Sequence, residues 1–182
     1  LRNNEDLQAI RALKKRDAEI NLFQKNVRRK VVTHYAISRD IENLPNGLVL
    51  LNMVVDVERV GDYTKNILDL ALNYPDTMIA EDFSKELAEI ENEVISRFEK
   101  TINAINSQDE DVAKSLMKTY KDVVSISDTI VNGCISGEIS QGSENKCVSL
   151  ALYARYLKRI AAHLKNISTI LVNPFEAVGY KK

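Results

Sequence analysis

The stretch that decides the fold of this chain is Asp56-Val57-Glu58-Arg59-Val60-Gly61-Asp62-Tyr63-Thr64-Lys65-Asn66-Ile67. It lies within a longer segment whose apolar residues recur at helical spacing. Glu58, Asp62 and Asn66 follow one another at every fourth position, so they project from nearly the same side of one helix. Two carboxylates at this spacing repel each other by roughly 0.2–0.5 kcal/mol on a helix surface. A metal ion or a positively charged group close to both would turn that repulsion into attraction.

The rest of the chain also has the pattern of a helical protein. Its apolar residues recur three, four and seven positions apart, and no segment alternates apolar and polar residues over a strand's length. The prolines and glycines are concentrated between these periodic segments. We therefore expect five helices, over about residues 4–38, 45–73, 81–106, 107–133 and 143–173. Long helices joined by short loops predict an all-α antiparallel bundle that forms one domain, residues 1–182.

Composition excludes several classes of protein. The net charge is -1, so there is no basic field to attract nucleic acid. No apolar stretch approaches the ~18–20 residues that span a membrane, and Cys134 and Cys147 are expected to be free thiols in a reducing cytoplasm. The chain begins with Leu1 and not with Met, which suggests part of a longer protein. No phosphate-binding glycine loop, nucleophile elbow or zinc-hydrolase motif is present, so we do not expect an enzyme.

The chain contains an internal repeat. Residues 57–62 align with 157–162, and the match continues without a gap from 65–67 to 165–167. The second and fifth expected helices are therefore equivalent. We expect the first and fourth to correspond as well, since Lys15-Arg16-Asp17 and Tyr120-Lys121-Asp122 lie at similar distances upstream. The third helix has no counterpart in the first half. We expect the second and fifth helices to superpose by a pseudo-two-fold or similar rotation.

The motif within the quoted stretch resembles the signature of the PhoU family of phosphate-transport regulators. It has the form Glu58-Arg59-x-x-Asp62-x-x-x-Asn66-Ile67. The resemblance implies two repeats of three helices each. On that pattern residues 1–75 form a partial first repeat that lacks its first helix, and residues 81–175 form the second repeat. The missing helix would lie upstream of Leu1, or come from another segment or another chain.

The resemblance also implies a metal site. Several PhoU proteins bind iron or zinc through carboxylates of this motif, and Glu58 and Asp62 match the ligand positions. Asp17 could add a carboxylate from the first helix, although Asn21, its neighbour one turn on, departs from the acid expected there. Periodicity alone gives another interpretation, in which these carboxylates form a solvated polar stripe beside the apolar face.

The second repeat departs from the family pattern. Lys158 and Ala162 stand where a second acidic pair is expected, so at most one of the two metal positions is retained. Lys158 and Arg159 could pair with carboxylates of a neighbouring helix instead. His163, beside Ala162, is expected to be a half-exposed helix residue.

The function implied by the resemblance is regulation of phosphate uptake or phosphate signalling through protein contacts, with a phosphate transporter or a sensor kinase as partner. Membrane association would then be peripheral, through the transporter. The missing helix should leave apolar surface uncovered on the first two helices, which predicts a dimer or larger homo-oligomer. Two alternatives stay open: the cytosolic domain of a sodium/phosphate cotransporter, and a helical adaptor that binds no metal.

Overall fold

The computed structural model describes residues 6–74, 78, 83–137 and 144–180, and over these residues the chain is helical and has no strand. The all-α prediction is therefore confirmed. The elements are α1 (Leu7–Lys15), α2 (Asp17–Ser38), α3 (Leu44–Asn73), α4 (Ser84–Ser107), α5 (Glu110–Ser136), α6 (Glu144–Thr169) and a short 3₁₀ helix, η2 (Phe175–Ala177). The expected starts of the third and fifth helices, near 81 and 143, lie outside the described residues.

The first expected helix is two helices, because the α-helical hydrogen bonding is interrupted at Arg16. The Arg16 amide donates to the Leu13 carbonyl at 3.0 Å, and the Glu19 amide donates to the Arg16 carbonyl at 2.9 Å. These bonds reach back three residues and tighten the chain locally, so α1 ends and α2 begins without a proline or glycine to mark the place. The sequence pattern could not indicate the interruption, since the apolar spacing continues across it.

The last expected helix ends at Thr169 and not at residue 173. Beyond this point the chain turns back, and three bonds hold the turn. The Asn173 side-chain amide donates to the Ala177 and Tyr180 carbonyls at 2.8 Å each, and the Gly179 amide donates to the Thr169 hydroxyl at 2.7 Å. Gly179 has a φ of 88°, a left-handed conformation that glycine adopts without steric cost.

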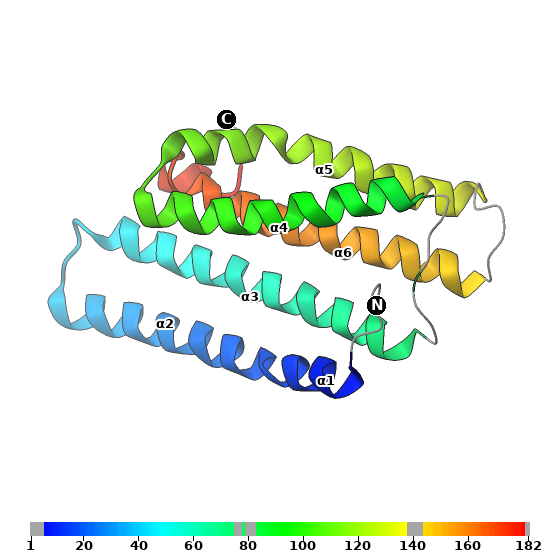
Figure 1. Ribbon diagram of the computed structural model, residues 1–182. Coiled ribbons are helices and arrows are strands. Elements are labelled where there is room, and N and C mark those ends of the chain that lie inside the picture. Colours follow the sequence, from blue (N-terminus) through cyan, green and yellow to red (C-terminus); the bar gives the residue numbers. More distant parts are fainter. Residues whose placement is uncertain (1–5, 75–77, 79–82, 138–143, 181–182) are drawn as a thin grey trace.

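Four of the helices lie side by side in the order α2, α3, α6, α5, and α4 packs across α5 and α6 (Figure 1). Neighbours in the row are antiparallel. Cross-links between them include Lys65 to Asp17 between α3 and α2, and Asp56 to His163 between α3 and α6. The remaining pair, α5 and α6, is joined by the Ser127 hydroxyl, which donates to the Ala154 carbonyl at 3.1 Å. Helix α4 instead runs parallel to α6, because Glu91 meets Tyr153 and Thr101 meets Ser168.

The packed core belongs mainly to α4, α5 and α6. Arg97 of α4 is almost fully buried, and its guanidinium donates to the Leu116 carbonyl at 2.8 Å and to the Thr119 hydroxyl at 2.6 Å, both in α5. A buried guanidinium is stable only when its donors are satisfied, so these bonds fix α4 on α5. Within α2, which the structure describes in full, no residue is buried. The first half of the chain therefore has far less core than the second.

The contacts between α3 and α6 have the pattern that a two-fold axis requires. Asp56 meets His163, and the residues one hundred positions away in each helix, Tyr156 and Tyr63, also meet, with ring centroids 6.1 Å apart. Tyr63 and His163, which occupy the same position of the repeat, stack on each other at 5.7 Å. A residue that contacts its own repeat equivalent lies near the axis. These contacts support the expected rotation between α3 and α6.

The asymmetry of the core gives a prediction for one apolar residue in each half. Val123 of α5 is fully buried, whereas Phe23 of α2 is 54% exposed. Val123→Ala should lower the free energy of unfolding by about 2 kcal/mol through lost burial and a residual cavity. Phe23→Ala should cost less than about 1 kcal/mol although it removes more atoms. Urea unfolding followed by circular dichroism measures both; a Phe23→Ala loss as large as that of Val123→Ala would contradict the described packing.

Candidate functional site

Two ion pairs cross the boundary between α3 and the first two helices. Asp17 accepts a hydrogen bond from the Lys65 ammonium at 3.0 Å and another from the Asn21 amide at 3.1 Å. One turn along, Lys14 pairs with Asp69. The hydrogen bond and the charge of Asp17 raise the pKa of Lys65. Asp17 is therefore near α3, as the sequence suggested, but it is bound to a cation.

Glu58 and Asp62 share a guanidinium. The Arg59 side chain donates to Asp62 at 2.8 Å, and its Nε lies 3.8 Å from Glu58. Arg59 is therefore the positive charge that removes the repulsion between the two carboxylates. The Glu58 side chain is only 15% exposed, whereas that of Arg59 is 52% exposed. In this motif the charges of Glu58 and Asp62 are thus partly neutralised by Arg59, and Arg59 is the most exposed of the three side chains.

This donor set does not fit a preformed site for a divalent ion. Among the described residues, no three His, Cys, Asp or Glu side chains lie close enough together to hold a metal. Hard cations take about six oxygen ligands, and the nearest carboxylates here are already bound by Arg59 and Lys65. Iron or zinc at Glu58, Asp62 and Asp17 would have to displace those two cations. The assignment of these three residues as ligands stays a prediction.

In the second repeat Lys158, which stands where the family has an acidic residue, forms an ion pair with a neighbouring helix. The Lys158 ammonium lies 2.6 Å from an Asp128 carboxylate oxygen of α5, and the Lys158 side chain is 15% exposed. This is the pairing with a neighbouring helix that the sequence suggested for Lys158. Arg159 does not follow it, because its Nε donates to the Tyr63 hydroxyl of α3 at 3.0 Å and its guanidinium lies over the Tyr63 ring.

The polar group that sequence reasoning missed lies between α3 and α6. His163, expected to be half-exposed, is 8% exposed, and its Nδ1 lies 2.6 Å from an Asp56 carboxylate oxygen. The same oxygen accepts a bond from the Asn166 amide at 3.1 Å. His163 is buried because it faces Tyr63 near the pseudo-two-fold axis. The repeat alignment could have indicated this contact, because the aligned positions 63 and 163 hold Tyr and His, two side chains with planar rings.

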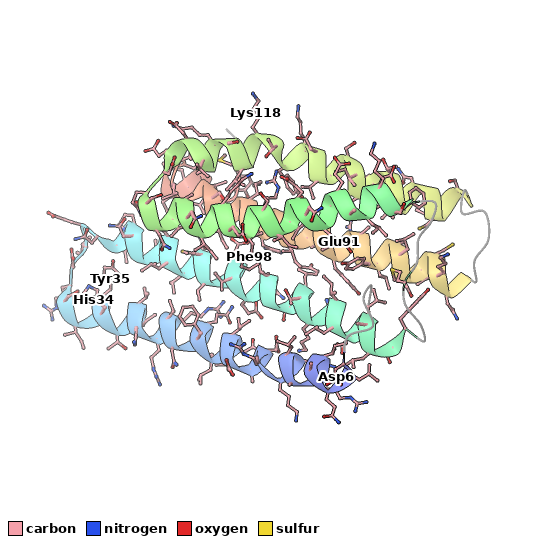
Figure 2. The ribbon with its side chains drawn as sticks, in the orientation of Figure 1. Asp6, His34, Tyr35, Glu91, Phe98 and Lys118 are labelled. Carbon is pink, nitrogen blue, oxygen red and sulfur yellow. The ribbon has the colours of Figure 1, made fainter. Side chains whose placement is uncertain are left out.

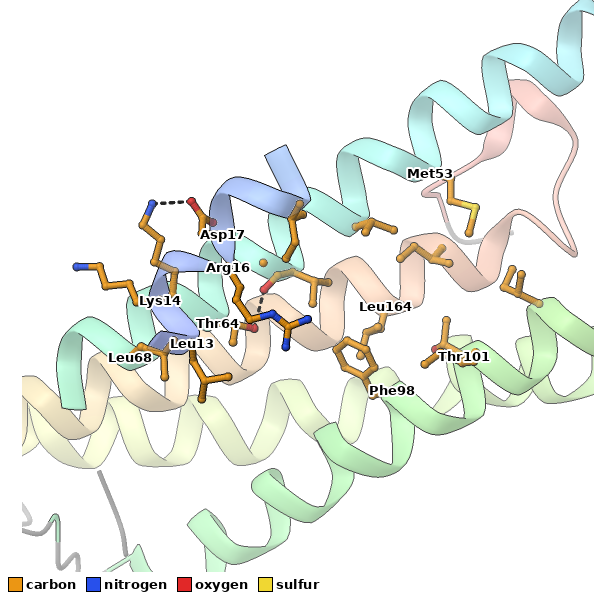
Figure 3. Close-up of a pocket in the computed structure, with 18 of the residues that line it drawn as sticks. Leu13, Lys14, Arg16, Asp17, Met53, Thr64, Leu68, Phe98, Thr101 and Leu164 are labelled. Carbon is orange, nitrogen blue, oxygen red and sulfur yellow. Dashed lines mark hydrogen bonds and ion pairs between the residues drawn. The ribbon is translucent and has the colours of Figure 1, made fainter. Parts of the chain in front are cut away.

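A groove opens beside the acidic cluster. It has a volume of about 560 Å³, and its walls come from α1, α2, α3, α4 and α6 (Figure 3). Most of the lining is apolar: Leu13, Ile20, Met53, Val57, Val60, Leu68, Phe98, Ile102, Ile105, Leu164 and Ile167. Lys14, Arg16 and Asp17 lie at its α1–α2 wall, and Thr64 and Lys65 come from α3. The groove offers a long apolar surface with charges at one side.

The comparisons with known proteins decide the family. The PhoU domain matches residues 1–71 and 87–171. The chain belongs to the PhoU family. This confirms the resemblance inferred from Glu58–Ile67, and the matched segments fall in the two halves that the repeat defines. No curated protein and no solved structure gives a significant match. Within the described part of this PhoU domain, no helix is long and apolar enough to cross a membrane.

The Asp56 cluster between α3 and α6 predicts an unusually costly substitution. Asp56→Ala would leave the buried His163 and the half-buried Asn166 side chains without their acceptor, which should cost about 2–3 kcal/mol of unfolding free energy. Asp69→Ala breaks the more exposed pair with Lys14 and should cost less than about 1 kcal/mol. Chemical denaturation at pH 7 measures both losses. Equal losses would show that the α3–α6 cluster does not stabilise the fold.

The metal assignment predicts opposite effects of two variants. If the motif holds iron or zinc, Glu58→Ala combined with Asp62→Ala should abolish bound metal with little loss of helix. Arg59→Met frees both carboxylates and should increase bound metal. Elemental analysis after loading with either ion measures the metal, and Lys118→Met on α5 serves as a control. Equal metal in all four proteins, or none in any, would leave the carboxylates as an ion-paired surface cluster.

Proposed function

We propose that this protein regulates phosphate uptake or phosphate signalling through contact with a phosphate transporter or a sensor kinase. The observation that carries the proposal is the PhoU match over both halves of the chain, together with the complete Glu58–Ile67 motif. PhoU proteins are regulatory and not catalytic. The proposed site of action is the cytoplasm, with the transporter supplying any attachment to the membrane.

The surface of α3 supports a contact role. Arg59 is half-exposed above Glu58 and Asp62, so this cluster can meet a partner without unfolding any helix. Charges at the edge of an interface mainly set the rate and specificity of association. Lys118, by contrast, projects from α5 away from the rest of the bundle (Figure 2).

The second candidate is the cytosolic domain of a sodium/phosphate cotransporter. It is favoured by the exposure of α2, because a helix without a buried residue offers a face for further polypeptide. In that case the same domain would regulate the transporter to which it is joined. Fractionation of host cells distinguishes the two: a separate regulator leaves the membranes after an alkaline wash, and a cotransporter domain stays with them.

The regulatory proposal predicts a loss of control in the native host. Deletion of residues 1–182 should raise phosphate uptake, measured with radiolabelled phosphate, because the contact of this domain with its partner damps transport. Arg59→Glu should have part of the same effect, since it reverses the charge at the centre of the cluster. Lys118→Glu makes the same change of charge on α5 and should leave uptake normal. Uptake that is unchanged by the deletion would contradict the proposal.

A further inference from the structure

The two cysteines lie on neighbouring helices at the same end of the bundle. Cys134 is in the last turn of α5 and Cys147 is in the first turn of α6, and these two helices are antiparallel neighbours in the row (Figure 1). Both thiols are free, and both residues are half-buried. The fold therefore brings two nucleophilic side chains to one helix boundary, and the proposed regulatory contact uses neither of them.

The register of α5 on α6 places the two cysteines opposite each other. The Ser127 hydroxyl of α5 donates to the Ala154 carbonyl of α6 at 3.1 Å, and this bond shows which residues are opposite. In an antiparallel pair, a step of seven residues forward on one helix and seven back on the other keeps both residues on the contacting faces, because seven residues make about two turns. Cys134 is seven residues after Ser127, and Cys147 is seven residues before Ala154. The cysteines therefore occupy facing positions two turns from this bond.

The side chain of Cys134 reaches α6. Burial is the main cause that raises the pKa of this thiol, the Cys147 thiol raises it further, and a hydrogen bond with the Ala151 backbone acts in the opposite direction. Ala151 is one turn from Cys147 on α6, so the Cys134 thiol lies at the part of α6 that carries Cys147. A disulfide needs Cα atoms about 4.4–6.8 Å apart, and small side chains such as Ser127, Ala154 and the cysteines allow two helices to approach closely.

We propose that Cys134 and Cys147 form a reversible intramolecular disulfide that links the end of α5 to the start of α6 under oxidising conditions. The oxidant is a low-molecular-weight disulfide such as oxidised glutathione. The thiolate of Cys147 attacks this disulfide, which releases one small thiol and leaves a mixed disulfide on the protein. The thiolate of Cys134 then attacks the Cys147 sulfur and releases the second small thiol. One S–S bond thus replaces another, and the two protons of the protein thiols end on the two small thiols.

The disulfide would restrain a place where three helices meet. Phe83, the residue before α4, packs so closely on Gly133 of α5 that a Cβ there would have no room. Cys134 follows Gly133 directly, so a bond from Cys134 to α6 would hold the start of α4 and the ends of α5 and α6 together. Disulfides in a reducing cytoplasm are usually transient and redox-sensing, which suits a signal and not a permanent link. This inference does not depend on the proposed regulation of phosphate.

The test equilibrates residues 1–182 in buffers of reduced and oxidised glutathione, then blocks the remaining thiols and measures the mass. The expected product is a monomer that has lost two hydrogen atoms and carries no glutathione. The matched control combines Cys134→Ser with Ile135→Cys, which moves one thiol about 100° around α5 to a position that is 79% exposed. The equilibrium constant for ring closure should be at least about tenfold larger for the wild type, because only its thiols face each other in the fold. In concentrated urea the two constants should become equal, since the two loops differ in length by one residue.

Each other outcome overturns the proposal. Equal constants in the folded state would show that motion of the chain, and not the register of α5 on α6, brings the thiols together. A mixed disulfide that does not close, or a bond between two chains, would show that the two thiols do not face each other. A difference that persists in urea would not come from the fold. If circular dichroism shows that the control is unfolded, Cys147→Ser combined with Val148→Cys makes the same move on α6, to a position that is 58% exposed.

Discussion

The contact between α3 and α6 is the constraint on which the rest of the structure depends. It joins the two repeats, and its centre is polar: Asp56 accepts bonds from His163 and Asn166, while Tyr63 stacks on His163 and accepts from Arg159. Apolar packing alone tolerates sliding between antiparallel helices. A carboxylate that is largely shielded from water, as Asp56 is, resists sliding because a shift would separate it from its donors. The cluster therefore fixes the register of α3 on α6, and with it the position of both half-domains.

From this fixed contact the two repeats diverge. In the second repeat α4 covers α5 and α6, so the side chains that face it are buried and Arg97 finds partners in α5. In the first repeat the described residues include the short α1, which packs against α3, but no described helix as long as α4 lies over α2 and α3. Positions of α3 that are equivalent to buried residues of α6 consequently line an open groove. These α3 residues are mostly apolar, so the two halves differ in what covers them.

Charge is arranged differently in the two halves as well. The acidic motif of α3 is compensated within its own helix by Arg59, and Asp17 is compensated across the helix boundary by Lys65. On α6 the equivalent position holds Lys158, which pairs with Asp128 of α5. Helix α3 therefore carries a partly exposed charge cluster within itself, whereas α6 uses a charge pair to join two helices.

The sequence by itself determined the helical class, the repeat between α3 and α6, and membership of the PhoU family. These follow from local signals, because apolar periodicity and the Glu58–Ile67 motif need no knowledge of neighbouring helices. The interruption at Arg16, the burial of His163, and the cations that occupy the acidic residues were decided only by the tertiary structure. The burial of His163 and the pairing of Asp17 with Lys65 depend on which side chain lies across a helix boundary, and residues as far apart as Asp56 and His163 carry no sign of their contact in local spacing. The repeat alignment placed Tyr63 and His163 at one position, but only the antiparallel packing of α3 on α6 brought the two rings together.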